Sequence, residues 1–203
     1  MQAIEGESLG LHVVLFSTRQ QGLEHYLEQE LKRFFEANGI KILVHASHYD
    51  QVIMNLDPER HQVPSGPFLR FLDAFDLNDV HSLKLGIVGE DMFSDSHSSL
   101  NFIFGEARVN GASSVIALPR LDPRFYGLEF NEKRYLGRVM KEATHELGHV
   151  LGLRHCDDVR CIMHFSNCIE DTDIKHVQPC ASCKKMLEKN VEKRLSLAHR
   201  NLD

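Results

Sequence analysis

Residues 145–155 read HELGHVLGLRH, in which two histidines lie four positions apart and a third follows six positions later. On a helix, His145 and His149 lie on one face and can bind the same ion through their ring nitrogens. Gly152 can take the left-handed conformation that ends a helix, and such a turn would bring His155 back to that ion. Zinc binds imidazole readily, and three protein ligands leave its fourth position open, as in catalytic sites. We therefore predict a catalytic zinc on His145, His149 and His155.

Glu146 directly follows the first of these histidines. A carboxylate at this position can accept the proton of a water that attacks a carbonyl group beside zinc. Chance explains the pattern poorly. His and Gly each occur 13 times in 203 residues, so adding Gly152 and His155 to the His-Glu-x-x-His match lowers its chance expectation roughly 200-fold. We predict that Glu146 is the general base.

The motif belongs to a predicted helix over residues 132–151. At about 100° per residue, the apolar side chains of this helix cluster within about 60° of Leu136, whereas His145 and His149 fall at about 180° and 220°. The two histidines therefore point away from the packed face and toward a cleft.

Upstream of this helix, short apolar runs alternate with amphipathic segments. Strands are predicted at residues 11–16, 40–44 and 83–88, with helices at 20–38 and 68–75 between them. This order is typical of an α/β fold whose mixed, mostly parallel, twisted sheet is covered by helices.

The remaining segments are less regular. The polar residues 90–101 are predicted to form a loop, and short strands are predicted at 102–104 and 115–118. Pro119 favours an edge position for the second of these strands. A final helix is predicted at 184–199.

The length of 203 residues and the 42% hydrophobic content suit one globular core with a small appendage. We expect an N-terminal α/β subdomain at residues 1–152, which includes the active-site helix. A C-terminal subdomain at 153–203 would then contain the third histidine ligand, all five cysteines and the final helix.

The formal charge of −6, from 23 Lys and Arg against 29 Asp and Glu, does not suit a general nucleic-acid binder. Residues 1–10 are polar and lack the basic start and apolar core of a signal peptide. The apolar run at 13–16 is too short to span a bilayer. We expect a cytoplasmic, monomeric protein that binds neither nucleic acid nor membrane.

Four of the five cysteines form two close pairs, Cys156 with Cys161 and Cys180 with Cys183. In a reducing compartment, closely spaced cysteines bind metal more often than they form disulfides. Four thiolates can hold a structural zinc, which would fix the direction of the neighbouring His155. The alternatives are reduced, buried thiols, or a nucleic-acid-binding zinc finger, for which the intervening sequence lacks basic residues.

The run from His145 to Cys183 resembles the archaemetzincins, small metallopeptidases found in archaea and vertebrates. The resemblance covers the His-Glu-x-x-His-x-x-Gly-x-x-His-Cys motif, the following Cys-x-Met, the stretch 165–167 and the final Cys-x-x-Cys. It implies a metzincin-like fold with a small zinc-stabilised C-terminal subdomain.

The resemblance also implies two zinc ions per chain, one catalytic on the three histidines and one structural on the four paired cysteines. Met163 would lie in the turn beneath the catalytic metal, and Glu146 would be the base. Cys168 matches no ligand position in the family, so we expect a free, buried thiol there.

The implied reaction is hydrolysis of a peptide or protein substrate. Metzincin architecture suggests that an edge strand near residues 113–118 could pair with an extended substrate. One alternative is a zinc-dependent endoribonuclease, because one bacterial family uses three histidines at this spacing. That family typically lacks the glutamate and the cysteine cluster, and both are present here. Another alternative is a non-catalytic zinc-stabilised binding module, although a purely structural site usually has four protein ligands and needs no adjacent base.

Overall fold

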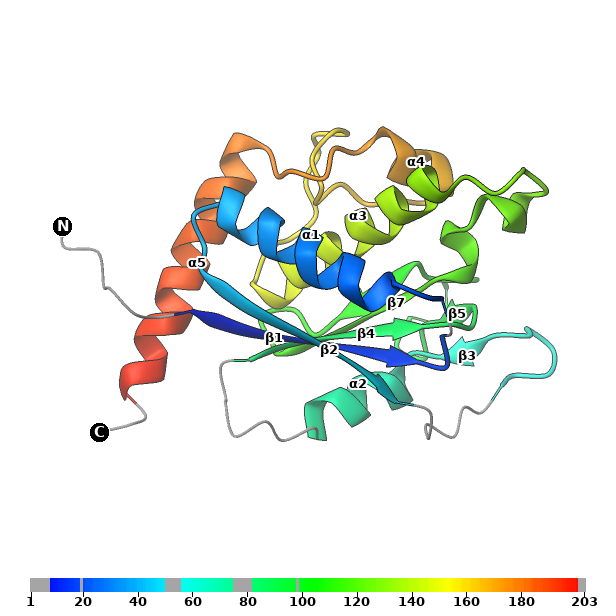
Figure 1. Cartoon of the computed structure of the whole chain (residues 1–203), viewed down its shortest axis with the longest axis horizontal. Coiled ribbons are helices and arrows are strands. Elements are labelled where there is room, and N and C mark those ends of the chain that lie inside the picture. The colour runs from blue at the N-terminus through cyan, green and yellow to red at the C-terminus, as the bar shows by residue number, and fades with distance from the viewer. Residues whose placement is uncertain (1–7, 19, 50–55, 75–81, 98, 201–203) are drawn as a thin grey trace.

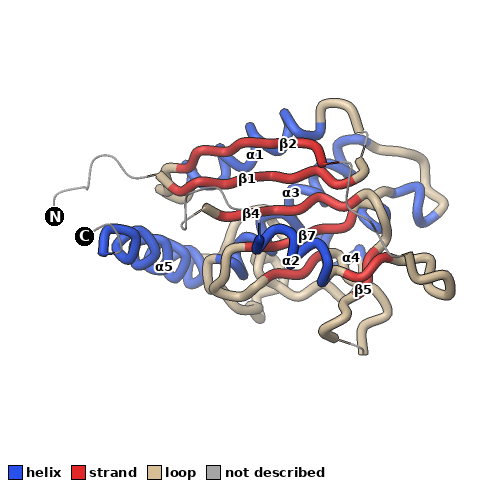
Figure 2. The backbone as a smooth tube through the Cα atoms, turned by 90° about the horizontal axis from the view of Figure 1, so that it is seen from below, coloured by secondary structure: helices blue, strands red, loops and turns tan. Residues whose placement is uncertain are grey.

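The computed structural model of the protein describes residues 8–18, 20–49, 56–74, 82–97 and 99–200. In this part of the chain, five strands form the sheet in the order β2–β1–β4–β7–β6 (Figures 1 and 2). The first four are parallel, and β6 runs antiparallel to β7. The mixed, mostly parallel sheet predicted from the sequence is thus confirmed. In sheet order the strands are β2 (Ile42–Tyr49), β1 (Leu9–Phe16), β4 (Leu83–Val88), β7 (Ser113–Ala117) and β6 (Gly105–Ala107).

Helices cover both faces of the sheet. Figure 1 shows α1 (Leu23–Ala37) and α3 (Glu132–Val150) on one face and α2 (Gly66–Ala74) on the other. The short α4 (Ile169–Ile174) contacts α3, and the long α5 (Ala181–Arg200) lies beside one end of the sheet. Helix α3, which carries the sequence HELGH at residues 145–149, therefore lies directly against the sheet.

Side chains alternate along β1, so that the strand contributes to two separate apolar cores. Leu11, Val13 and Leu15 belong to the core shared with α1 and α3, whereas Val14 and Phe16 belong to the core shared with α2. Both cores hold the sheet in place, and the first one supports α3 from below.

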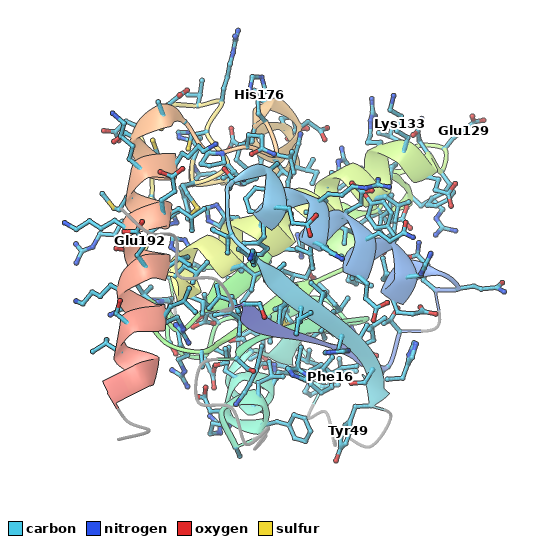
Figure 3. The ribbon with its side chains drawn as sticks, turned by 60° about the vertical axis from the view of Figure 1, so that its left-hand side comes forward. Phe16, Tyr49, Glu129, Lys133, His176 and Glu192 are labelled. Carbon is cyan, nitrogen blue, oxygen red and sulfur yellow. The ribbon has the colours of Figure 1, made fainter. Side chains whose placement is uncertain are left out.

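An aromatic cluster packs on the α2 side of the sheet. The ring centroid of Phe16 lies 5.2 Å from the centroid of Phe68, 5.5 Å from that of Phe71 and 6.2 Å from that of Tyr49. Phe16 and Tyr49 are register partners on neighbouring strands, and Figure 3 shows them at the same end of the sheet. This core lies on the face of the sheet opposite α3.

Most predicted elements exist, with ends that differ by a few residues. The helix predicted at 68–75 begins at Gly66, and residue 75, like residues 1–7, lies outside the described residues. The predicted loop at 90–101 contains a short strand, β5 (Met92–Phe93), which pairs with β3 (Val63–Pro64). The prediction of a strand at 102–104 was wrong, because only Ile103 forms an isolated bridge there and the strand follows at 105–107.

The expected edge position of the strand near 113–118 was also wrong. β7 pairs with β4 on one side and with β6 on the other, so β6 is the edge strand. Pro119 does not interrupt the pairing, because it lies beyond the strand at the first position of a 3₁₀ helix, Pro119–Leu121. A proline at that position loses no ladder hydrogen bond.

The larger apolar core contains residues from both sides of position 152, among them Leu147 and Leu187. The proposed division into subdomains stays a prediction. Among the described residues, no helix has the length and apolar character needed to cross a membrane.

Candidate catalytic metal centre

Helix α3 begins at a capped N-terminus. The side chain of Asn131 accepts a hydrogen bond from the backbone N–H of Arg134 at 2.9 Å, which satisfies one of the free donors of the first turn. Figure 3 labels Glu129 and Lys133 at this solvent-facing end of the helix. His145, Glu146 and His149 lie near the opposite end of the helix and are buried.

The other end of α3 is closed by Gly152, whose φ of 82° lies in the left-handed region. Its N–H donates to the carbonyl of His149, and the N–H of Leu153 donates to the carbonyl of Gly148, both at 2.9 Å. This pair of bonds is the Schellman motif, which reverses the chain direction after a helix. The reversal brings His155 back beside α3, as the sequence predicted.

The structure brings His145, His149 and His155 together. The Nε2 atom of His149 lies 3.1 Å from that of His145 and 3.2 Å from that of His155. In a tetrahedral zinc site with Zn–N bonds of about 2.0–2.1 Å, ligand nitrogens lie about 3.3 Å apart. The three ring nitrogens therefore fit one zinc ion.

The hydrogen bonds of the Nδ1 atoms of His145 and His149 determine which ring nitrogen carries the proton. The Nδ1 of His145 lies 2.8 Å from the carbonyl oxygen of Ile162, and that of His149 lies 2.9 Å from the carbonyl oxygen of Leu153. A carbonyl can only accept, so each Nδ1 donates and each Nε2 keeps a lone pair in the neutral ring. Two lone pairs 3.1 Å apart repel each other unless a cation lies between them.

Burial favours the neutral, metal-binding form of all three rings. It lowers the pKa of His145 well below the ordinary value, with a further contribution from the positive charge of Lys175. It also lowers the pKa of His149, and it lowers that of His155 to about 4. Neutral imidazole is the form that binds metal.

Glu146 lies with the three histidines on the wall of a cavity of about 390 Å³. Its side chain is only 5% exposed, and burial, followed by the charge of Glu142, raises its pKa. A bound divalent cation would act in the opposite direction, because it stabilises a nearby carboxylate. The predicted orientation of the motif toward a cleft is correct, although His145 and His149 are themselves buried at 5% and 9% exposure.

Gly105 on the edge strand packs directly against Glu146. A Cβ atom at this glycine would lie 2.6 Å from both the Cγ and the Oε1 of Glu146. Gly105 does not have a positive φ, so the close approach, rather than the backbone conformation, calls for glycine here. The backbone of β6 thus limits where the Glu146 carboxylate can lie.

A buried ion pair lies one helical turn before Glu146. The Nζ of Lys175 lies 3.1 Å from the Oε1 of Glu142, and these residues are 1% and 2% exposed. The Thr172 hydroxyl donates to the same oxygen at 2.9 Å and lies 3.1 Å from the Ser166 hydroxyl, which lines the cavity. This network ties α4 and the following residue to the active-site helix.

The sequence reasoning did not single out Glu142, Lys175 or Gly105. The position of Glu142 four residues before Glu146 on a predicted helix was a usable signal, because such residues share a face. No local pattern marks Lys175 or Gly105, since their contacts with the site are made across long stretches of chain.

The second cluster holds the four paired cysteines, whose sulfur atoms all lie within 4.8 Å of one another. The sulfurs of Cys156 and Cys180 are 3.8 Å apart, and the N–H of Cys180 donates to the sulfur of Cys161 at 3.3 Å. Zn–S bonds of about 2.3 Å place tetrahedral ligand sulfurs about 3.8 Å apart. These four thiols, none of which forms a disulfide, therefore fit a metal ion.

Cys168 lies outside this cluster, and the expectation that it is buried was wrong. It is exposed, because it caps the first turn of α4 at the surface, where its sulfur lies 3.5 Å from the Oδ2 of Asp171.

The turn after His155 connects the two clusters. The N–H of Cys156 donates to the carbonyl of Met163 at 2.9 Å, and His164 donates through its Nδ1 to the carbonyl of Cys156 at 2.8 Å. Met163 is fully buried, and its sulfur occupies the space next to Gly148 where a Cβ would otherwise lie. This turn therefore joins Cys156 of the thiol cluster to Met163, which packs against Gly148 of α3 between His145 and His149 in the sequence.

A cavity wall with three converging histidines and an adjacent buried glutamate is the arrangement expected of a zinc-dependent metallopeptidase, and the comparisons with known proteins place the chain in that class. The profile of peptidase family M54 matches residues 73–189. The archaemetzincin of Pyrococcus abyssi is 40% identical over 167 residues, which cover 82% of this chain and 87% of that relative. The chain belongs to the archaemetzincin family.

Solved structures agree in fold. The archaemetzincin of Methanopyrus kandleri is similar with a TM-score of 0.78 and 29% identity, over 93% of this chain and 98% of that one. A zinc-dependent peptidase from Methanocorpusculum labreanum is similar with a TM-score of 0.75 and 25% identity, over 88% of this chain and all of that one.

Proposed function

We propose that this metallopeptidase hydrolyses peptide bonds at a zinc ion held by His145, His149 and His155, with Glu146 as the general base. The observation that carries the proposal is the convergence of the three Nε2 atoms at 3.1–3.2 Å, while the Nδ1 atoms of the two helix histidines donate to backbone carbonyls. Such an arrangement of lone pairs is stable only around a cation.

When bound, zinc supplies Lewis acidity, which polarises the scissile carbonyl and lowers the pKa of a water toward ~7. Glu146 accepts the proton of the attacking water and then delivers it to the leaving nitrogen. Gly105 leaves room for this carboxylate, and the Nδ1 hydrogen bonds hold the rings of His145 and His149 in place. Met163 supports the triad from beneath, through its contact with Gly148.

The edge strand β6 is the proposed support for an extended substrate. The carbonyl of Phe104 accepts from Ala117, and the N–H of Arg108 donates to Ser113. Since successive residues of a strand bond to opposite sides, the backbone groups of Gly105 and Ala107 face away from β7. A peptide that pairs with them would lie next to Glu146 and the triad.

We also propose that the four paired cysteines hold a second, structural zinc, which gives two zinc ions per chain. Ligating thiolates are stable in a reducing compartment, so we propose a cytoplasmic location. The monomeric state expected from the sequence stays a prediction.

A peptide-library digest read by mass spectrometry tests the proposed activity. The zinc-loaded parent should cleave peptides, and His149→Ala should lose zinc and cleavage together. Structured RNA is tested in parallel, because a zinc-dependent endoribonuclease is the alternative. We expect no cleavage of RNA, since the acidic chain lacks the basic surface of a general nucleic-acid binder. Cleavage of RNA with no cleavage of any library peptide would overturn the proposal.

A further inference from the structure

The lining of the catalytic cavity includes four large apolar side chains: Leu100, Phe102, Val109 and Phe165. Among the described lining residues there is no lysine or arginine. A substrate side chain that contacts these four residues meets carbon atoms, and the described lining offers no lysine or arginine to pair with a negative charge.

The ring of Phe102 is held in place from two sides. The guanidinium carbon of Arg120 lies 4.0 Å from its centroid, and the edge-on ring of Phe104 lies 5.2 Å away. The guanidinium carbon of Arg120 also lies 4.8 Å from the centroid of Phe125, so the guanidinium contacts two aromatic rings. Cation–π contacts of this kind favour one ring position over others.

Arg120 is itself fixed by a bidentate pair with Asp91. Its Nε lies 2.7 Å from the Oδ1 and its Nη2 lies 2.8 Å from the Oδ2 of Asp91. Both side chains are largely buried, and Asp91 accepts a further bond from the Nε2 of Gln62 at 2.9 Å. Paired hydrogen bonds to a planar guanidinium restrict both its position and its orientation.

We propose that Arg120 is a positioning residue for substrate selection: it fixes the Phe102 ring as an apolar wall, and the cavity thereby selects peptides with an apolar side chain next to the scissile bond over peptides with an acidic one. This inference rests on the peptidase function proposed above. An apolar side chain gains contact with a wall that is already ordered, whereas a carboxylate would lose water without gaining a protein cation.

The chain offers a matched control outside the cavity. Arg124 is paired with Asp122 and lies 4.5 Å from the centroid of Phe130, which repeats the Asp–Arg–Phe arrangement. None of these three residues lines the cavity. Loss of this second stack removes similar contacts without touching the substrate.

The test uses peptides that differ only in having Phe, Leu, Ala or Glu on either side of the scissile bond. Phe102→Ala should lower kcat/KM for the Phe and Leu peptides about tenfold, mainly through KM, and should leave the Ala peptide nearly unchanged. Arg120→Gln should likewise lower the ratio of kcat/KM for the Phe peptide to kcat/KM for the Ala peptide, called the Phe-to-Ala ratio below. Phe130→Ala and Arg124→Gln should leave the ratio as in the parent, and melting temperatures of all four variants separate selection from general loss of fold.

Calorimetric binding of the same peptides to zinc-loaded Glu146→Gln separates this inference from the proposed function. Tighter binding of the Phe peptide than of the Ala and Glu peptides, abolished by adding Phe102→Ala, supports the wall even if the parent were found to cleave nothing. A preference for the Glu peptide, or a Phe-to-Ala ratio that Phe102→Ala does not change, would overturn it.

Discussion

Replacement of Gly105 by alanine should disable the active site through a single methyl group. The added Cβ would lie 2.6 Å from the Cγ of Glu146, about 1 Å short of an ordinary carbon–carbon contact of roughly 3.5–4.0 Å. Either the edge strand or the Glu146 side chain must therefore move by about that distance. A displacement of about 1 Å at a catalytic group typically costs about 10²-fold in rate. We expect kcat for Gly105→Ala to fall by that order.

The assay is steady-state cleavage of one fluorogenic peptide, with zinc content measured on the same sample. All three nearest atoms to the added Cβ belong to Glu146, so the zinc content should not change. Gly137→Ala in α3 is the matched control, because nothing lies within 4 Å of a Cβ there. It should keep full activity. A Gly105→Ala variant as active as the parent would refute the contact between β6 and the base.

Two further predictions concern the parts that hold the site together. Cys180→Ser and Cys183→Ser should each lower the melting temperature and remove one zinc equivalent, because a thiolate site contributes folding free energy directly, whereas the exposed Cys168→Ser should keep all its zinc. Elemental analysis and thermal melts check this prediction. Unchanged melting temperatures of both Cys180→Ser and Cys183→Ser would contradict a structural role for the metal on the four paired cysteines. Lys175→Met leaves the buried Glu142 without its cation. Loss of one partner of a buried ion pair typically lowers the free energy of unfolding by roughly 3–5 kcal/mol, which lowers the melting temperature of a chain this size by about 6–20 °C. The double variant Lys175→Met, Glu142→Gln should recover much of that loss, and a single variant that melts with the parent would disprove the importance of the pair.

The parts predictable from the sequence were those whose signal is local. The spacing of the histidines, Gly152 at the helix end and the paired cysteines each report on neighbours within a few residues, and the structure brings each set together. The long amphipathic helix α3 was predicted to within one residue. Its long apolar stripe is a strong signal, because many residues must agree on one face.

What the sequence did not show depends on residues far apart in the chain. Whether residues 113–117 form an edge or a central strand is decided by the pairing of 105–107, a segment too short to have its own periodicity. The pair of Glu142 with Lys175 and the stacking of Phe102 on Arg120 likewise join separate segments. The surface position of Cys168 follows from the short helix α4, whose six residues carry too little pattern to predict.

The most direct test of the central claim is the behaviour of Glu146→Gln. The substitution keeps the size of the side chain but removes its ability to accept the proton of water, and it touches none of the three histidine nitrogens. We predict that the variant keeps the parent's zinc content and melting temperature and cleaves peptides about 10²- to 10⁴-fold more slowly. Peptide cleavage at the parent's rate, with zinc fully bound, would contradict the assignment of Glu146 as the base.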